Sequence, residues 1–304
     1  MRVWLTGGNG LLGRAIRRQA GGVTLLAPSR AELDLTDRAA VAAWLAANPV
    51  DAVIHAAARV GGIAANIADP AGFLTDNLRM NDAVITGADA AGVGRLLFIG
   101  SSCVYPRDYR QPLGETDLMA APLEPTNEGY ALAKLAGMRL CDYISGSGSG
   151  RAYRSLIPCN LFGVDDHFGT AGAHLLAAAI HKIVAAQTAG ADTVEIWGSG
   201  TARREFLEAD HLARFVLDAL PRLADLPSVL NIGAGVDRSV AEWYGLIAEL
   251  AGWHGRFTFD LTRPEGMRAK LLSSARAAQH GYAPPADIRP ALSRAIAACR
   301  EKMT

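Results

Sequence analysis

Apolar stretches rich in β-branched residues alternate with alanine-rich stretches through the first half of the chain. RVWLTGG (2–8), DAVIHAAA (51–58) and RLLFIGSS (95–102) have the composition of strands, and each is followed by a stretch with helical character. Strands that are apolar without interruption need cover on both faces, and intervening helices supply that cover in a parallel sheet. We therefore predict an α/β fold built on a Rossmann-like, doubly wound parallel sheet.

The alternation loosens after Asn160, where a long glycine-bearing segment (161–174) follows. SVLNIGAG (228–235) has the composition of a strand that returns to the main sheet. The last part of the chain reads as a smaller C-terminal α/β lobe. We expect two domains that are interleaved in sequence, the larger from 1–163 plus about 208–240 and the smaller from about 164–207 plus 241–304.

The bulk composition excludes several classes of protein. Half of the 304 residues are hydrophobic and the formal net charge is zero, so a large core is possible and no nucleic-acid partner is indicated. No apolar run reaches the roughly eighteen residues of a membrane span, and the first residues lack a signal-peptide pattern. The four cysteines have no CxxC spacing. We therefore expect a cytoplasmic protein with no metal site and no membrane contact.

Three glycines form a GxxGxxG motif, Gly7, Gly10 and Gly13, between the first strand and the helix that follows it. Such a turn lets backbone approach a pyrophosphate and points a helix N-terminus at the anion, although glycine-rich turns without this role are common. The second strand ends in Ser29 and Arg30, where an NAD site carries an acidic residue. A hydroxyl and a guanidinium suit a 2′-phosphate, so we predict NADP(H); the alternative is a solvated surface arginine.

Two further features lie near this motif. Asp34 fits either the adenine side of the site or the start of a helix near Thr36. The small residues Ala56 to Ala58 end a strand where larger side chains would block a cofactor.

A second group of polar residues has the pattern of a reductase site. Tyr130 and Lys134 are four apart on one expected helix, and Ser101 and Ser102 end the preceding strand, where ligands bind in open α/β sheets. We expect the Lys134 ammonium to lower the pKa of the Tyr130 phenol, which then donates a proton to a carbonyl oxygen.

The role of Cys103 is open from its spacing alone. It is either a small buried residue or a base that faces the same way as Ser101 on an extended segment, and a thiolate needs nearby positive charge. His174 opens an alanine-rich helix, but His167 and His181 are comparable histidines and His211 is a weaker candidate.

Four blocks resemble the GDP-L-fucose synthases, a branch of the extended short-chain dehydrogenases. They are AARVGGIAAN (57–66), GSSCVYP (100–106), LEPTNEGYALAKLAG (123–137) and WGSGTARREFL (197–207). The similarity runs from about residue 2 to about residue 270, and these blocks are far more specific than GxxGxxG or Tyr-x3-Lys.

The resemblance implies roles residue by residue. Ser101, Tyr130 and Lys134 match the catalytic triad, Cys103 matches the epimerisation base and His174 matches the epimerisation acid. The implied cofactor residues are Gly7, Gly10, Leu11, Leu12, Gly13, Arg30, Asp34, Leu35, Ala56, Ala57, Ala58, Lys134, Pro158, Asn160, Leu161 and His174. The implied substrate residues are Ser102, Asn127, Asn160, Lys182, Trp197, Arg204 and Arg268.

The implied reaction is NADPH-dependent 3,5-epimerisation and 4-reduction of GDP-4-keto-6-deoxy-D-mannose to GDP-L-fucose by a homodimer. In the family pattern PDGTPRKLLD an arginine stands where this chain has Ala269, with Arg268 one residue earlier. Two alternatives are kept. An enzyme for another GDP-linked keto-deoxy sugar or heptose would differ at this stretch. A non-enzymatic dinucleotide-sensing regulator would have no need for Ser101, Tyr130 and Lys134 together. A 4,6-dehydratase is disfavoured because Ser102-Cys103 offers no acidic residue.

Overall fold

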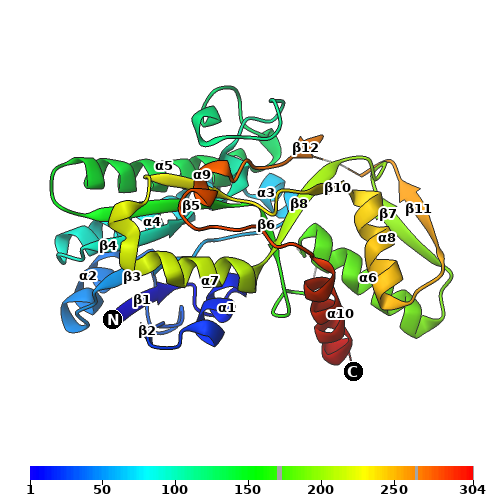
Figure 1. Ribbon diagram of the computed structural model, residues 1–304, viewed down its shortest axis with the longest axis horizontal. Helices are drawn as coiled ribbons and strands as arrows, with labels where there is room; N and C mark the ends of the chain where they lie inside the picture. Colours follow the sequence, from blue (N-terminus) through cyan, green and yellow to red (C-terminus); the bar gives the residue numbers. More distant parts are fainter. Residues whose placement is uncertain (170–172, 264–265, 304) are drawn as a thin grey trace.

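The computed structural model describes residues 1–169, 173–263 and 266–303. Its centre is a six-stranded sheet in which every neighbouring pair is parallel (Figure 1). The strands lie in the order β2 (Thr24–Leu26), β1 (Arg2–Thr6), β3 (Ala52–His55), β4 (Arg95–Ile99), β5 (Ala152–Pro158) and β9 (Val229–Ile232). This confirms the predicted parallel sheet, including the return of the 228–235 stretch to it.

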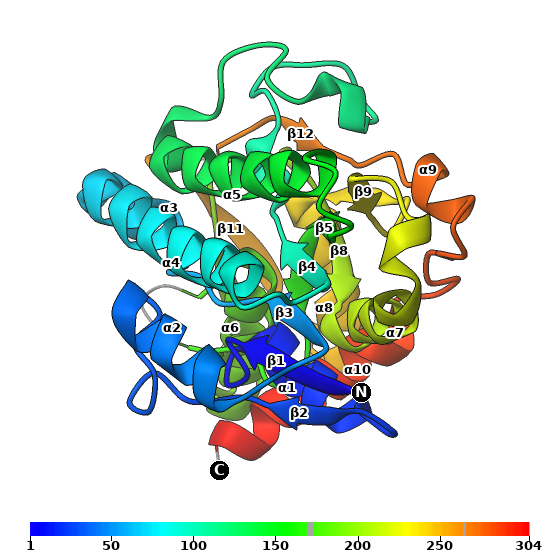
Figure 2. The same cartoon turned by 90° about the vertical axis from the view of Figure 1, so that its left-hand side faces the viewer.

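Helices cover both faces of this sheet, as a doubly wound fold requires (Figure 2). One layer holds α2 (Arg38–Ala47), α4 (Pro70–Ala90) and α5 (Glu128–Gly146), with the short α3 (Ile63–Ala68) beside α4. The other layer holds α1 (Leu11–Gln19) and α7 (Ala209–Ala219), which pack on each other. Four 3-10 helices complete this part, at Ser102–Val104, Glu115–Asp117, Pro125–Asn127 and Leu220–Asp225.

The start of α4 is fixed by its own first residues. The Asp69 carboxylate accepts a hydrogen bond from the Gly72 amide at 2.9 Å, and Pro70 occupies the first turn. A side-chain cap followed by proline is a strong start signal, so the helix begins at Pro70.

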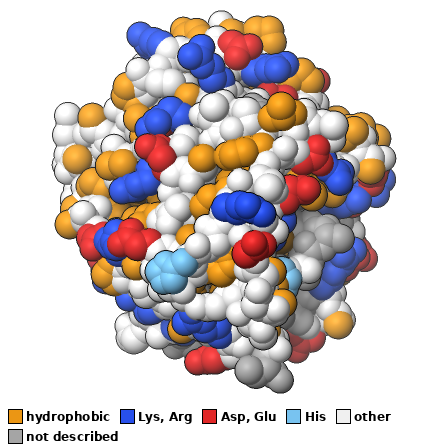
Figure 3. Space-filling view, turned by 90° about the vertical axis from the view of Figure 1, so that its right-hand side faces the viewer, with side chains coloured by type: hydrophobic (Ala, Val, Ile, Leu, Met, Phe, Trp, Pro, Cys, Tyr) orange, Lys and Arg blue, Asp and Glu red, His pale blue; other side chains and the backbone are white. Residues whose placement is uncertain are grey.

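The smaller lobe has its own sheets. β8 (Arg203–Glu208) pairs with β10 (Asp237–Ser239), β12 (Ala269–Lys270) and β6 (Asn160–Phe162), while β7 (Thr193–Trp197) pairs with β11 (Arg256–Asp260). The helices are α6 (Leu175–Ala189), α8 (Val240–Ala251), α9 (Ala275–Ala278) and α10 (Arg289–Met303). Figure 3 views the end of the molecule formed by this lobe, where acidic and basic side chains are interspersed.

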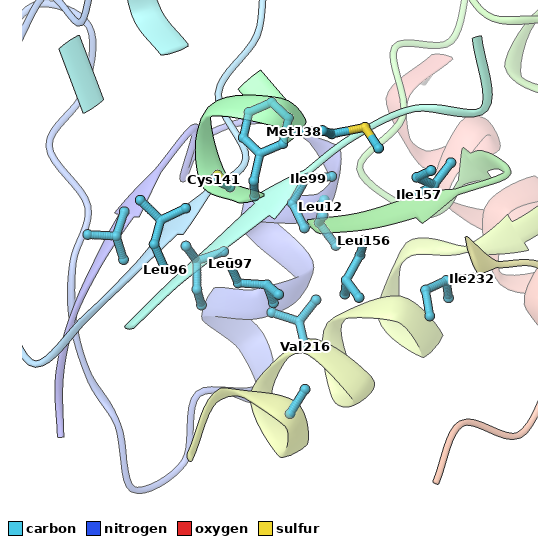
Figure 4. Close-up of a cluster of buried hydrophobic side chains, with 14 of the residues drawn as sticks. Leu12, Leu96, Leu97, Ile99, Met138, Cys141, Leu156, Ile157, Val216 and Ile232 are labelled. Carbon is cyan, nitrogen blue, oxygen red and sulfur yellow. The ribbon is translucent and has the colours of Figure 1, made fainter. Parts of the chain in front are cut away.

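The buried apolar residues form two clusters. The first joins the six-stranded sheet to its helices, and Figure 4 shows Leu97 and Leu156 from the strands beside Val216 of α7. The second lies among α6, α8 and α10. Leu272 and Tyr282 belong to the first cluster, so they pack with the residues of the six-stranded sheet and its helices.

The chain passes between the two sheets at the end of β5. Pro158 pairs with Ile232 in the main sheet, and Asn160 already pairs with Phe206 of the second sheet. The carboxyl ends of β1, β3, β4 and β5 therefore face the smaller lobe, which is where open α/β sheets bind ligands. Within the described residues, no helix is both long and apolar enough to span a bilayer.

Candidate active site

The glycine-rich turn after β1 is packed too closely for side chains at two positions. A Cβ on Gly7 would lie 2.7 Å from the Ala57 backbone nitrogen, and a Cβ on Gly13 would lie 2.1 Å from the Gly7 carbonyl oxygen. Gly7 also has a φ of 72°, in the left-handed region that favours glycine. In the sheet, β1 lies between β2 and β3, so the chain runs to one side of β1 first and then to the other. The turn after β1 therefore lies at the switch point of the sheet.

The start of α1 is open to an anion. Its N-cap residue is Gly10, which supplies no side-chain cap, whereas α2, α4 and α8 each have one. Leu11 and Leu12 form the first turn, so their amides belong to the group that lacks partners within a helix. An uncapped helix N-terminus beside a tight glycine turn suits a pyrophosphate.

Basic side chains lie at the far end of this turn. Arg30 is exposed after β2, and the α1 arginine Arg17 donates a hydrogen bond to the Asn9 side chain at 3.1 Å. Arg17 also lies beside Gly8. Sequence reasoning missed Arg17, although its position on the amphipathic helix after the motif was a usable signal.

Asp34 has a local role in the structure. Its carboxylate accepts hydrogen bonds from the Thr36 amide at 2.9 Å and from the Thr36 hydroxyl at 2.8 Å. These bonds lower the pKa of Asp34. The helix that follows is capped by Asp37, so Asp34 serves the turn before it. Leu35 packs partly buried against the main core.

A buried polar chain fixes the helix that carries Tyr130 and Lys134. His55, at the end of β3, contacts the Thr6 hydroxyl at 2.7 Å and the Asn81 side chain at 3.2 Å. Asn81 in turn donates to the Ala133 carbonyl of α5 at 2.9 Å. Burial lowers the pKa of His55 to about 3, so the ring is neutral and has a structural role.

The structure brings Ser101, Tyr130 and Lys134 together. Tyr130 is hydrogen-bonded to the Ser101 side chain, and the Lys134 ammonium lies 5.8 Å from the centre of the Tyr130 ring. Lys134 is buried, and its ammonium donates a hydrogen bond to the Ile99 carbonyl at 2.8 Å. The loss of hydration lowers the pKa of Lys134 to about 7.

The expected lowering of the Tyr130 pKa does not occur in the chain alone. Burial raises the pKa of Tyr130 above its usual value, nearby Cys103 raises it further, and the hydrogen bond with Ser101 only partly offsets both. The phenol is therefore protonated at neutral pH, which is the state that a proton donor needs.

Cys103 lies against this group on a 3-10 helix, Ser102–Val104, and not on the extended segment that was expected. The Ser101 hydroxyl oxygen caps that helix by accepting from the Cys103 amide at 3.2 Å. The Cys103 thiol accepts from the Asn127 amide at 3.2 Å and from the Lys270 ammonium at 3.7 Å. Sequence reasoning missed Lys270, since nothing in its spacing linked it to Cys103.

Asn127 has an unused acceptor. Its side-chain oxygen is buried and has no hydrogen-bond partner among the residues that the structure describes. A buried amide oxygen of this kind favours a donor from a ligand. Ser102 is also buried beside Cys103.

His174 is exposed at the N-cap of α6. Burial raises the pKa of the Asp166 carboxyl, and His174 and His167 lie close enough to offset part of that rise. In the described part of the chain, no hydrogen bond or ion pair joins His174 to Cys103 or Tyr130. The His181 ring packs under Gly169, further along the same segment.

Lys182 and Trp197 come together in the smaller lobe. The Lys182 ammonium lies 5.0 Å from the Trp197 ring centre and donates to the Glu195 carbonyl at 2.8 Å. The Arg263 guanidinium lies 4.7 Å from the same ring, a contact that sequence reasoning missed. Trp197 is 53% exposed, so a large apolar ring is presented between two cations.

Arg204 and the 266–270 stretch adjoin the same lobe. Gly266 packs near the Arg204 guanidinium and near Ile63 of the VGGI block. Ala269 pairs with Arg203, whereas Arg268 is exposed. Neighbouring residues of an extended segment point to opposite faces, so the one-residue shift places the Arg268 side chain away from the Ala269 position.

The strand ends at 158–161 link the two lobes. Asn160 donates to the Glu205 carbonyl at 2.9 Å, which fixes the crossing between the sheets. Pro158 and Leu161 flank this crossing. Of the described residues, no group of three or more His, Cys, Asp and Glu side chains could hold a metal ion.

Comparison with known proteins places the chain among nucleotide-sugar enzymes. The model of the NAD dependent epimerase/dehydratase family matches residues 3–233. The GDP-L-fucose synthase of Azorhizobium caulinodans is 43% identical over 93% of this chain and 91% of its own length. The GDP-L-colitose synthase of Yersinia pseudotuberculosis is 38% identical over 97% of this chain and 96% of its own length. The solved GDP-mannoheptose C4 reductase from Campylobacter jejuni, with NADP bound, has a TM-score of 0.87 at 26% identity over 98% of this chain and 97% of that one.

These matches extend over nearly the whole chain and cover both lobes. The chain therefore belongs to the NAD dependent epimerase/dehydratase family, in the group of the GDP-L-fucose synthases.

Proposed function

We propose that this chain uses NADP(H) to convert GDP-4-keto-6-deoxy-D-mannose to GDP-L-fucose by 3,5-epimerisation and 4-reduction. One observation carries the proposal. The protonated Tyr130 phenol is hydrogen-bonded to Ser101, shares a face of its helix with the buried Lys134, and lies next to Cys103. The GDP-L-fucose synthases to which the chain is similar support the choice of substrate.

The residues around the glycine-rich turn fit NADP(H). The cradle at Gly7 and Gly13 and the uncapped start of α1 would hold its pyrophosphate, and Arg30 with Arg17 would pair with its 2′-phosphate. Ala56 to Ala58 and the 158–161 crossing would border its other parts. When bound, the reduced dinucleotide supplies the hydride that reaches C4 of the sugar.

Ser101, Tyr130 and Lys134 serve the reduction. Tyr130 gives its proton to the oxygen at C4, and the Ser101 hydroxyl donates a hydrogen bond to the same oxygen. Lys134, on the next turn of α5, keeps positive charge near the phenolate that results. These three side chains would have no purpose in a protein that only senses a dinucleotide.

Cys103 and His174 serve the epimerisation. The C4 ketone makes the protons at C3 and C5 acidic, and Cys103 removes them while Ser101 and Tyr130 stabilise the enolate oxygen. His174 returns a proton from the opposite face. We predict that Cys103→Ser abolishes proton exchange with solvent at C3 and C5; exchange at the native rate would remove Cys103 from this role.

The smaller lobe would bind the nucleotide. Trp197, held between cations, offers a stacking surface for a base or sugar, and Lys182 and Arg204 offer charge to the diphosphate. The free Asn127 oxygen offers an acceptor for a sugar hydroxyl near Cys103.

We also propose that the two hydrophobic clusters are the cores of separate cofactor and substrate domains.

A second candidate is an enzyme for another GDP-linked keto-deoxy sugar or heptose. Ala269 favours it, because the exposed Arg268 does not replace the family arginine, and so do the relatives that act on colitose and mannoheptose nucleotides. This candidate keeps the same catalytic residues. If the enzyme turns over GDP-4-keto-6-deoxy-D-mannose more slowly than a GDP-linked heptose substrate, the result favours this second candidate.

We further propose a cytoplasmic homodimer formed through α4 and α5. These helices pack on each other and carry exposed Leu78 and Leu132. The four free cysteines agree with a reducing compartment. Sedimentation should give a dimer for the native chain and a monomer for Leu132→Asp; a native monomer would contradict this assembly.

Tyr130→Phe tests the proposed function. It removes one hydroxyl and should slow reduction by a factor of about 10² to 10⁴. Tyr143→Phe is the matched control, because Tyr143 lies on the same helix and is 70% exposed, and it should react at the native rate. NADPH binding should persist in both variants. Unchanged turnover of Tyr130→Phe would refute the catalytic assignment, and a native chain that binds NADPH without turnover would favour the sensing regulator.

A further inference from the structure

Lys270 meets Cys103 although 167 positions separate them in sequence. The Lys270 side chain is buried, with 7% of its surface exposed, and its ammonium lies 3.7 Å from the Cys103 sulfur. A second donor, the Asn127 amide, lies 3.2 Å from the same sulfur. The sulfur is thus the acceptor for two donors that come from different parts of the fold.

The backbone around Lys270 is fixed on both sides. The Arg268 carbonyl accepts a hydrogen bond from the Arg203 amide at 2.8 Å. The Leu113 amide donates to the Leu271 carbonyl, and the Leu113 carbonyl accepts from the Ser273 amide, each at 2.8 Å. The Gln111 side chain accepts the Leu271 amide at 2.7 Å, and the buried Glu205 carboxylate accepts the Leu272 amide at 3.0 Å. Lys270 therefore approaches Cys103 from a rigid strand and not from a loop.

Within the described residues, no salt bridge joins the Lys270 ammonium to a carboxylate. Its charge also acts on Cys159, whose thiol stays neutral because burial raises its pKa. Two titratable groups of the described residues lie beside Cys103, the Lys270 ammonium and the Tyr130 phenol of α5, whose burial keeps it neutral. A buried cation without an anion is costly, and a thiolate would supply that anion.

We propose that Lys270 is a positioning residue that holds Cys103 as a thiolate, ready to take the proton from carbon. This inference rests on the proposed function, in which Cys103 is the base. Positive charge beside a cysteine favours the thiolate, which is the reactive form. Asn127 adds a hydrogen bond to the same sulfur and keeps its free oxygen for the substrate.

The proton-transfer step balances with the groups present. The Cys103 sulfur takes the proton from C3 or C5, and the C–H electron pair becomes the C=C bond of an enolate whose charge lies on the C4 oxygen. Cys103 becomes a neutral thiol and Lys270 stays protonated throughout. His174 then protonates the carbon, and both side chains exchange protons with solvent before the next cycle.

Site-resolved alkylation tests the inference without turnover. Iodoacetamide would be applied to the ligand-free native protein from pH 6 to pH 10, with the peptide that contains Cys103 quantified by mass spectrometry. In Lys270→Met, alkylation at pH 7 should fall about ten-fold, and its half-maximum should move up by about one pH unit. Lys270→Arg should keep the native profile, and Arg139→Met, which removes an exposed cation on α5, should have no effect.

Lys270→Gln repeats the measurement if Lys270→Met does not fold. An unchanged alkylation profile in a folded Lys270→Met or Lys270→Gln variant overturns the inference. A variant whose only change is a higher KM for the GDP-sugar also overturns it, because Lys270 would then bind substrate. Solvent exchange at C3 and C5 separates this result from the proposed function. If Cys103→Ser still exchanges the protons at C3 and C5 with solvent, Cys103 is not the base. If Lys270→Met loses this exchange at pH 7 and regains it at pH 9, the result supports the role of Lys270.

Discussion

Gly13→Ala perturbs the contact on which the cofactor cradle depends. The new Cβ would lie 2.1 Å from the Gly7 carbonyl oxygen and 2.6 Å from the Gly8 Cα. Both neighbours are backbone atoms, so no side-chain rotation relieves the clash and α1 must move from the turn. Overpacking of this kind costs about 1 to 3 kcal/mol, and alanine's better helix propensity returns up to about 1 kcal/mol. We expect a net loss of about 2 kcal/mol in the free energy of unfolding.

The displacement of α1 should also weaken NADPH. Urea unfolding gives the stability of the ligand-free chain, and quenching of protein fluorescence gives the dissociation constant for NADPH, which we expect to rise at least about ten-fold. Gly245→Ala is the control, because Gly245 lies inside α8 with no atom within 4 Å of an added Cβ. It should be neutral or stabilising by up to about 1 kcal/mol. If Gly13→Ala matches this control in both measurements, the close-packed cradle is wrong.

Three further perturbations follow from single contacts. Arg30→Ala should weaken NADPH binding much more than NADH binding, and an equal loss for both would count against the 2′-phosphate contact. Trp197→Ala should raise KM for the GDP-sugar and leave NADPH affinity unchanged, since the ring is half-exposed and distant in sequence from the glycine turn; an unaltered KM would remove its stacking role. Burial raises the pKa of Glu205 from 4.5 to about 7, so its contribution to stability is fully present below pH 4.5 and declines by about 3 kcal/mol as pH rises to 7. The difference in unfolding free energy between native protein and Glu205→Gln should show that decline, and a difference independent of pH would contradict it.

The six-stranded parallel sheet could be predicted from sequence because its signals are local. Buried strands such as 95–99 have no polar interruptions, and the GxxGxxG turn stands directly between a strand and a helix. The pairing of Tyr130 with Lys134 follows from helix periodicity alone. Ser101 joins them because the carboxyl ends of parallel strands share one edge of the sheet.

Contacts that depend on tertiary packing could not be predicted. Lys270 reaches Cys103 through a two-residue strand that pairs with β8, and no period in the sequence encodes that pairing. The direction of the Tyr130 pKa was also missed, because spacing reveals a neighbouring charge but not the burial that outweighs it. Arg17 and Arg263 act through side-chain direction, which only the fold determines.

Reaction in D2O tests the central claim most directly. The native protein would be incubated with GDP-4-keto-6-deoxy-D-mannose and NADPH, and the product would be analysed by NMR. The account predicts GDP-L-fucose with deuterium at both C3 and C5, protium at C4 from the dinucleotide, and NADPH oxidised in equal amount. A product that keeps protium at C3 and C5, or no oxidation of NADPH at all, would contradict it.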